Sequence, residues 1–337
     1  MCQTERRDMM NREEVARIAG VSTTTVTRVV TGQGYVSEKT RKKVMDAVKQ
    51  FNYKPNLFAQ NLRHGKSNII VVLTEDLCNT YTARSIEVMT SEAQKYGYTV
   101  MLYTVTDHNL SGVIDEIVQM RVFGVINLTH IVITERDCAA VDEAKIRTVN
   151  FFYRADHSDR DLNVDVDYAE AMREAFERLQ KSGKRRPIFI GGLGRGLLFN
   201  NSRVHAFCEL SKEYGWYRGE GSIFSGDYPR EKYQQFGYRC TKQALAEGYP
   251  FDSVFCLTDT AAVGVMCALH EAHKCIPEDV AVIGCDNMYD SLMTYPALTS
   301  IDNGVERVCL EYIRFLVSDK KSDDLNIEAK LICRDTL

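Results

Sequence analysis

Short apolar segments rich in β-branched residues alternate with helical patterns between residues 69 and 283. The apolar segments occupy residues 69–73, 99–103, 124–128, 148–152, 187–190, 253–257 and 280–283. Helical patterns lie between most of them, at residues 83–96, 113–122, 168–182, 203–214, 232–247 and 260–273. Strands that alternate with helices are typical of parallel sheets covered on both faces. We therefore expect an α/β core of two doubly wound parallel-sheet lobes, with a ligand site at the carboxyl ends of the strands.

Three short helical patterns precede this core. The first runs from Arg12 to Ala19, and Gly20 can end it in a left-handed conformation. Ser22 and Ser37 can cap the second and third helices by accepting backbone N–H bonds. Apolar residues recur on one face of each helix: Val15, Ile18, Ala19, Val26, Val29, Val30, Val44, Ala47, Val48 and Phe51. Two short helices joined by a tight turn and braced by a third predict a small all-α helix-turn-helix domain.

Charge is unevenly distributed along the 337 residues. Residues 1–65 contain 12 Lys or Arg and 6 Asp or Glu, so they carry +6. The whole chain has a net charge of −4, so the remainder carries −10. A basic module on an acidic body is expected when only that module contacts phosphates. Charge alone does not separate this interpretation from a chance asymmetry.

The sequence also indicates a cellular compartment. No apolar run approaches the roughly 20 residues that span a bilayer, and residues 1–8 have no apolar stretch typical of a secretory signal. The 11 cysteines form no CxxC pair and are scattered singly, several of them through apolar segments. We therefore expect a cytoplasmic protein with reduced thiols and no membrane partner.

Several motifs resemble the LacI/GalR (lactose/galactose repressor) family of bacterial transcriptional regulators. The headpiece motifs are EVARIAGVSTTTVTRVV at 14–30, GYVSEKTRKKV at 34–44 and NYKPN at 52–56. The core motifs are IPEDVAVIGCDN at 276–287, PALTSI at 296–301 and CRDT at 333–336. The resemblance covers nearly the whole chain and implies a core similar to periplasmic sugar-binding proteins.

The resemblance divides the chain into four parts. These are an N-terminal extension at 1–10, a helix-turn-helix DNA-binding domain at 11–55, a hinge helix with linker at 56–67, and a ligand-binding, dimerising core at 68–337. Within the core, lobe 1 would comprise about 68–164 and 302–322, and lobe 2 about 165–301 and 323–337.

The resemblance also implies roles in binding operator DNA. Thr23, Thr24 and Arg28 occupy the base-reading positions, which suits their chemistry because Arg can bind guanine O6 and N7 and Thr can contact thymine. Backbone phosphates would be held by Ser22, Thr25, Thr31, Tyr53 and Asn56. Leu62 would insert into the minor groove at the hinge, with Arg63 beside it. The expected partner is double-stranded, pseudo-palindromic DNA, whose two half-sites require two headpieces and therefore a homodimer. No leucine heptad closes the sequence, so we expect a dimer rather than a coiled-coil tetramer.

A small-molecule effector is the second implied partner. Arg203 and Asp286 match ligand-binding positions of the family, and an Arg fork with a carboxylate suits vicinal sugar hydroxyls. The other expected contacts are Tyr81, Tyr153, Tyr228 and Thr258. Tyr228 stands where an aromatic often stacks on a sugar, whereas Tyr153 stands where an Asp is common and Thr258 where Asn or Ala is common. A sugar or sugar derivative is the leading ligand class, although Asp286 could instead only brace its turn.

Two other sequence features have weaker functional interpretations. The glycine-rich segment at 191–196 is not GxGxxG and lacks the Lys-Ser/Thr of a phosphate loop, so a glycine-rich connection is favoured over an enzyme site. Cys267, His270, His273 and Cys275 match no established zinc spacing, so we expect no metal. No catalytic set stands out, and we expect neither an enzyme nor a cofactor.

The combined interpretation is a sequence-specific DNA-binding transcriptional regulator, expected to repress sugar-utilisation genes and to associate with the nucleoid when bound to DNA. A sugar-binding transport protein would share the core but should have a signal peptide and no basic headpiece. Repression and activation are not distinguished, because the position of the operator decides between them.

Overall fold

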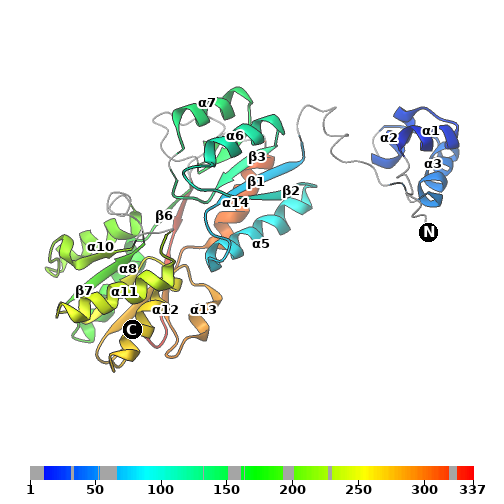
Figure 1. The fold of residues 1–337 in the computed structure, drawn as a ribbon. Helices are drawn as coiled ribbons and strands as arrows, with labels where there is room; N and C mark the ends of the chain where they lie inside the picture. The colour runs from blue at the N-terminus through cyan, green and yellow to red at the C-terminus, as the bar shows by residue number, and fades with distance from the viewer. Residues whose placement is uncertain are drawn as a thin grey trace, which may run out of the picture. The chain divides into compact units, whose positions relative to one another are not determined.

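The computed structural model describes residues 11–31, 34–51, 53, 67–131, 133–150, 161–162, 164–192, 201–226, 230–318 and 325–337. The chain divides into two compact units, residues 1–67 and 68–337 (Figure 1). The predicted fold class, a helix-turn-helix headpiece followed by a two-lobed α/β core, is confirmed. None of the helices formed by the described residues is both long and apolar enough to cross a bilayer.

The headpiece contains the three predicted helices, α1 (Arg12–Ala19), α2 (Thr23–Thr31) and α3 (Glu38–Gln50). Their apolar faces meet in a small core of Val15, Ala16, Ala19, Val26, Val29, Val44 and Ala47. Ile18 and Phe51 differ from expectation, because they remain 45% and 39% exposed although both belong to the apolar patterns of their helices.

Local capping chemistry sets where these helices begin and end. The side chains of Asn11 and Glu14 each accept a hydrogen bond from the other's backbone N–H at 2.9 Å, which forms a capping box at the start of α1. Gly20 ends α1 with a φ of 65°, as predicted. Ser22 accepts from the N–H of Thr25 at 3.1 Å and so caps α2.

The first lobe is a parallel sheet in the order β2-β1-β3-β4-β5. Its strands are β1 (Ile69–Thr74), β2 (Thr99–Thr104), β3 (Gly124–Asn127), β4 (Arg147–Val149) and β5 (Asp161–Leu162), and its helices are α5 (Thr80–Lys95), α6 (Leu110–Gln119), α7 (Glu135–Glu143) and α14 (Val305–Val317). Successive residues of β1 point to opposite faces. Ile70 and Val72 pack in one apolar cluster with α5 and α14, whereas Val71 and Leu73 pack in another with α6 and α7 (Figure 1).

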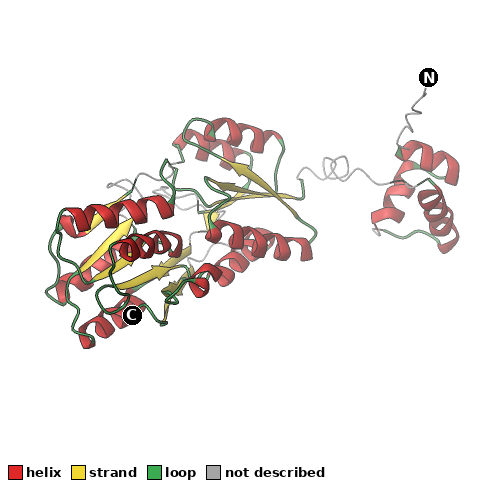
Figure 2. Ribbon diagram, turned by 60° about the horizontal axis from the view of Figure 1, so that its bottom comes forward, coloured by secondary structure: helices red, strands yellow, loops and turns green. Residues whose placement is uncertain are grey.

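The second lobe has the sheet order β13-β11-β10-β9-β7-β8, in which only β13 is antiparallel to its neighbour. The strands are β7 (Pro187–Gly191), β8 (Ile223–Ser225), β9 (Ser253–Cys256), β10 (Ala281–Cys285), β11 (Thr299–Asp302) and β13 (Lys330–Ile332). The helices are α8 (Ala169–Lys181), α10 (Ser202–Glu213), α11 (Tyr233–Ala246), α12 (Asp259–Glu271) and α13 (Tyr289–Met293), with a 3₁₀ turn at Glu220–Ser222. Figure 2 shows both sheets as yellow strands between red helices.

Several segments connect the two lobes. β6 (Val164–Asp167) leads from the first lobe to the second, and β12 (Leu325–Glu328) pairs with it in parallel. A third connection runs from β11 to α14, which returns the chain to the first lobe. The lobes are therefore joined along one set of adjacent segments, and the cavity described below lies between them.

Candidate nucleic-acid interface and ligand cavity

The surface of α2 carries the predicted base-reading residues. Thr24 and Arg28 are exposed and lie four residues apart, so they share one face of the helix, and Thr23 is half-buried beside them. The Arg28 side chain runs along Gly34, where an added Cβ would lie 3.4 Å from Arg28 Cδ. This arrangement presents a guanidinium and a hydroxyl on one side of a short helix.

The residues predicted to hold phosphates differ in how far they are buried and in whether the structure describes them. The hydroxyls of Ser22 and Thr25 lie 2.9 Å apart at the N-terminus of α2. Tyr53 is half-buried against the headpiece core, and burial raises the pKa of its hydroxyl. Thr31 ends α2, but its side chain lies outside the described residues. Asn56, Leu62 and Arg63 also lie outside them, as do the effector candidates Tyr153 and Tyr228.

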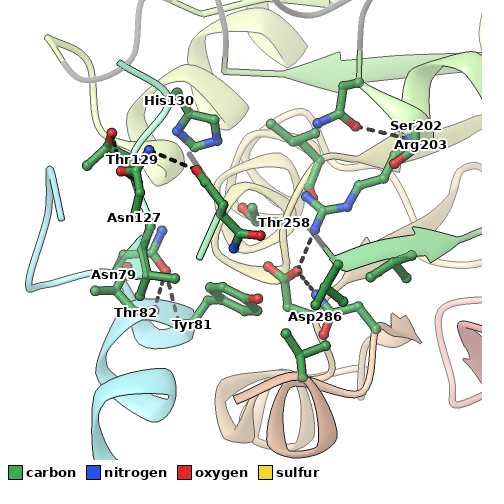
Figure 3. Close-up of a pocket in the computed structure, with 18 of the residues that line it drawn as sticks. Asn79, Tyr81, Thr82, Asn127, Thr129, His130, Ser202, Arg203, Thr258 and Asp286 are labelled. Atoms are coloured by element: carbon green, nitrogen blue, oxygen red, sulfur yellow. Dashed lines mark hydrogen bonds and ion pairs between the residues drawn. The ribbon is translucent and has the colours of Figure 1, made fainter. Parts of the chain in front are cut away.

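A cavity of about 400 Å³ lies between the lobes at the carboxyl ends of several strands (Figure 3). First-lobe residues on its wall include Asn79, Tyr81, Asn127, Asn150 and Tyr312, and second-lobe residues include Tyr168, Arg203, Tyr233, Thr258 and Asp286. The structure thus brings together four of the six predicted effector contacts, namely Tyr81, Arg203, Thr258 and Asp286. Such a position is where ligands bind in open α/β folds.

Arg203 and Asp286 form an ion pair in the cavity wall. Arg203 Nη2 lies 3.1 Å from Asp286 Oδ1, and Arg203 Nη1 donates to the carbonyl of Leu257 at 3.0 Å. Asn303 donates to the same carboxylate oxygen at 2.8 Å. Burial raises the pKa of Asp286 to about 6, although the Arg203 charge opposes this rise. Asp286 also has a φ of 101°, a conformation rare for a residue with a side chain and one that concentrates at functional sites.

Three buried polar atoms in the cavity wall have no hydrogen-bond partner among the described residues. They are Arg203 Nε, a donor, and the side-chain oxygens of Asn150 and Asn303, which are acceptors. Buried polar groups are nearly always hydrogen-bonded, because leaving one unpaired costs about 1–3 kcal/mol. The cavity is therefore suited to a ligand that offers both acceptors and donors.

Asn150, Asn303 and Tyr312 were absent from the sequence-based candidates. Asn150 directly follows β4, where the sequence pattern had extended the strand to residue 152, and it has a φ of 57°. Its side-chain nitrogen donates to the hydroxyl of Tyr312 at 2.6 Å. Its backbone carbonyl accepts from the side-chain amide of Asn127 at 3.2 Å. Asn127 and Asn150 are polar residues at the ends of buried strands, and this position in the sequence could have identified both as candidate ligand contacts.

Thr258 and Tyr81 have structural partners as well as cavity positions. Thr258 accepts from the N–H of Ala261 at 3.1 Å and so caps α12, which occupies one lone pair of its hydroxyl. Asn79 caps α5 by accepting from the N–H of Tyr81 at 2.9 Å. Burial raises the pKa of Tyr81 well above its ordinary value, so the group remains a neutral hydrogen-bond donor.

Gly192, in the glycine-rich segment, packs against an aromatic ring. A Cβ on Gly192 would overlap the ring of Phe236, so this glycine permits close packing. Residues 193–196 lie outside the described part. Among the described residues, no three His, Cys, Asp or Glu side chains come together in a way that could hold a metal ion. The ten cysteines described are all free.

The chain matches two protein families. Residues 13–56 match the "Bacterial regulatory proteins, lacI family", and residues 176–336 match a "Periplasmic binding protein-like domain". The chain is 27% identical over 336 residues to the ribose operon repressor of Lactococcus lactis, covering 98% of each chain. It is 28% identical over 293 residues to the catabolite control protein A of Priestia megaterium, covering 86% of each.

Solved structures have the same fold. The lac repressor dimer bound to operator and the anti-inducer ONPF superposes with a TM-score of 0.77 at 22% identity, covering 98% of this chain and 99% of that one. A LacI family regulator from Enterococcus faecium with bound ribose gives a TM-score of 0.66 at 19% identity, covering 80% of this chain and 98% of that one.

Proposed function

Because this chain belongs to the lacI family of bacterial regulatory proteins, we propose that it represses sugar-utilisation genes under the control of a polyhydroxylated small molecule. It is a DNA-binding transcriptional regulator with a ligand-binding core. The relatives named above are regulators, and we assign no catalytic reaction to the cavity.

The proposed DNA contacts divide by chemistry. Thr23, Thr24 and Arg28 read base edges, because α2 presents them together and Arg is suited to guanine. Ser22, Thr25, Thr31, Tyr53 and Asn56 hold the backbone, and Leu62 with Arg63 enters the minor groove. Selection of bound duplexes from a random DNA pool tests this assignment. Two related half-sites should be enriched, and enrichment of no common sequence would contradict sequence-specific binding.

The effector proposal rests on the three unpartnered buried atoms. Their residues line the cavity, so a ligand with several hydroxyls can offer acceptors to the Arg203 guanidinium and donors to the side chains of Asn150 and Asn303. Tyr81, Thr258 and Asp286 add polar groups around it, and Tyr153 and Tyr228 remain proposed contacts. An uncharged sugar is the ligand class that combines these groups most simply.

A thermal-shift screen of the full chain tests the ligand class. The panel comprises D-ribose, D-glucose, D-galactose, cellobiose, their phosphates, and nucleosides. A true effector should raise the unfolding temperature with concentration, because it binds only the folded state. Arg203→Ala should abolish that rise. Stabilisation by phosphates or nucleosides alone would contradict an uncharged sugar.

We also propose that the chain acts as a homodimer, because a pseudo-palindrome requires two headpieces. An exposed apolar surface on and after α13, consisting of Tyr289, Leu292, Met293 and Tyr295, supports this proposal. Clustered large apolar side chains on a protein surface mark interaction sites. We call these four residues the α13 surface.

A further inference from the structure

Two polar contacts bridge the lobes beside the cavity. Lys232 Nζ, at the start of α11 in the second lobe, lies 2.9 Å from Asp76 Oδ2, which follows β1 in the first lobe. The hydroxyls of Thr80 and Thr260, also from opposite lobes, lie 3.3 Å apart. Both contacts require the lobes to be close together.

The surroundings of Asp76 hold its carboxylate in place. The Asp76 side chain is only 9% exposed, whereas that of Lys232 is 47% exposed. The other oxygen of Asp76 accepts from the N–H of Cys78 at 3.0 Å, which fixes the carboxylate in its loop. A fixed, largely buried carboxylate gains from a nearby cation, because burial removes its water.

Residues next to the ion pair, and residues of the connecting strand β6, line the same cavity. Thr74 and Asn79, on either side of Asp76, line it, as does Tyr233 beside Lys232. Val164 and Val166 of the connecting strand β6 also line it. Separation of the lobes about the connecting segments would break the Asp76–Lys232 contact and open the cavity to solvent.

We propose that the Asp76–Lys232 ion pair is a clasp that holds the lobes closed over the cavity before any ligand binds. Neither Asp76 nor Lys232 lines the cavity, so the clasp is distinct from the proposed effector contacts. It sets the equilibrium between closed and open lobes, and the Thr80–Thr260 contact supplements it. The consequence for effector affinity rests on the proposed function, whereas the clasp itself can be tested without a ligand.

Zero-length carbodiimide cross-linking of the full chain tests whether the pair exists in solution. The reagent joins an amine to a carboxylate only when the two are in contact, and mass spectrometry identifies the linked peptides. We expect a link between Lys232 and Asp76. The control is Lys242 with Glu271, a pair at 3.4 Å within the second lobe that does not depend on closure. Formation of the control link without the interlobe link would overturn the proposal.

Hydrogen exchange tests whether the pair controls closure. Asp76→Asn keeps the acceptor for the Cys78 N–H but removes the charge, so backbone amides at 74–82 should exchange about five-fold faster than in the wild type. Lys232→Met should have the same effect and Lys232→Arg should restore slow exchange. Lys242→Met is the matched control and should leave exchange at 74–82 unchanged. Unchanged exchange in both Asp76→Asn and Lys232→Met, or an equal increase in Lys242→Met, would overturn the clasp whatever the effector is.

Discussion

Asn150 donates a side-chain hydrogen bond to the hydroxyl of Tyr312 at 2.6 Å and so joins the end of β4 to α14. Both residues are buried and line the cavity. The amide nitrogen of Asn150 is held by Tyr312, and its side-chain oxygen has no hydrogen-bond partner among the described residues. This hydrogen bond therefore stabilises the first lobe and also holds a side chain that lines the proposed effector site.

Tyr312→Phe should lower the free energy of unfolding by about 1–2 kcal/mol, because it leaves the Asn150 amide as a buried, unpaired donor. Urea unfolding measures this loss. Tyr295→Phe is the matched control, since Tyr295 is 99% exposed and its hydroxyl has no buried partner to leave unpaired. Equal stability of the two variants would show that the Asn150–Tyr312 hydrogen bond makes no net contribution to the free energy of unfolding.

Local patterns predicted much of this molecule. Gly20 and Ser22 end and begin helices as their chemistry indicates, and alternation of strand and helix predicted the two-lobed core. The strand and helix patterns ended at residue 283 and omitted α14, although the family resemblance had placed residues 302–322 in the first lobe, where α14 packs. The contact between Asn150 and Tyr312 spans 162 positions, so only tertiary packing reveals it.

Arg28→Ala should reduce the preference for operator over random DNA by roughly ten-fold or more, because a bidentate contact to guanine contributes about 1–3 kcal/mol of discrimination. Binding to both DNAs is measured by fluorescence anisotropy at fixed salt. Thr25→Ala, at a proposed phosphate contact, should weaken both affinities by a similar factor because phosphate contacts carry no sequence information. An unchanged preference in Arg28→Ala would remove Arg28 from the base-reading set.

Stability should decrease as the pH rises from 6 to 8.5. Burial raises the pKa of Asp259 from 3.8 to about 8, and the charge of Asp286 adds to this rise. The folded chain therefore binds more protons than the unfolded chain, and the stabilisation present at low pH is lost as the pH passes through about 8.

Thermal unfolding across this pH range measures the effect. Asp259→Asn should flatten the decrease, because the amide does not titrate, whereas the exposed Asp290→Asn on α13 should not. A decrease of the same slope in the Asp259→Asn variant would assign the pH dependence to other groups.

Gly192→Ala should destabilise the second lobe by about 1–3 kcal/mol, because its Cβ would overlap the fully buried ring of Phe236. Gly221→Ala is the control, since an added Cβ there has no atom within 4 Å and the backbone is not left-handed. Urea unfolding of the two variants gives the difference. Equal stability would show that the glycine-rich segment is not retained for packing.

Leu292→Lys should shift the chain from dimer to monomer, because a charge in the centre of an apolar interface between copies has to be desolvated without a partner. Leu292 belongs to the α13 surface and is 49% exposed. Tyr96→Lys is the matched control, since Tyr96 is also 49% exposed but lies at the end of α5. Sedimentation velocity at several protein concentrations measures the dimer fraction. The operator affinity of each variant should follow its dimer fraction, because both half-sites must be occupied together. Loss of the dimer in Tyr96→Lys but not in Leu292→Lys would place the interface elsewhere.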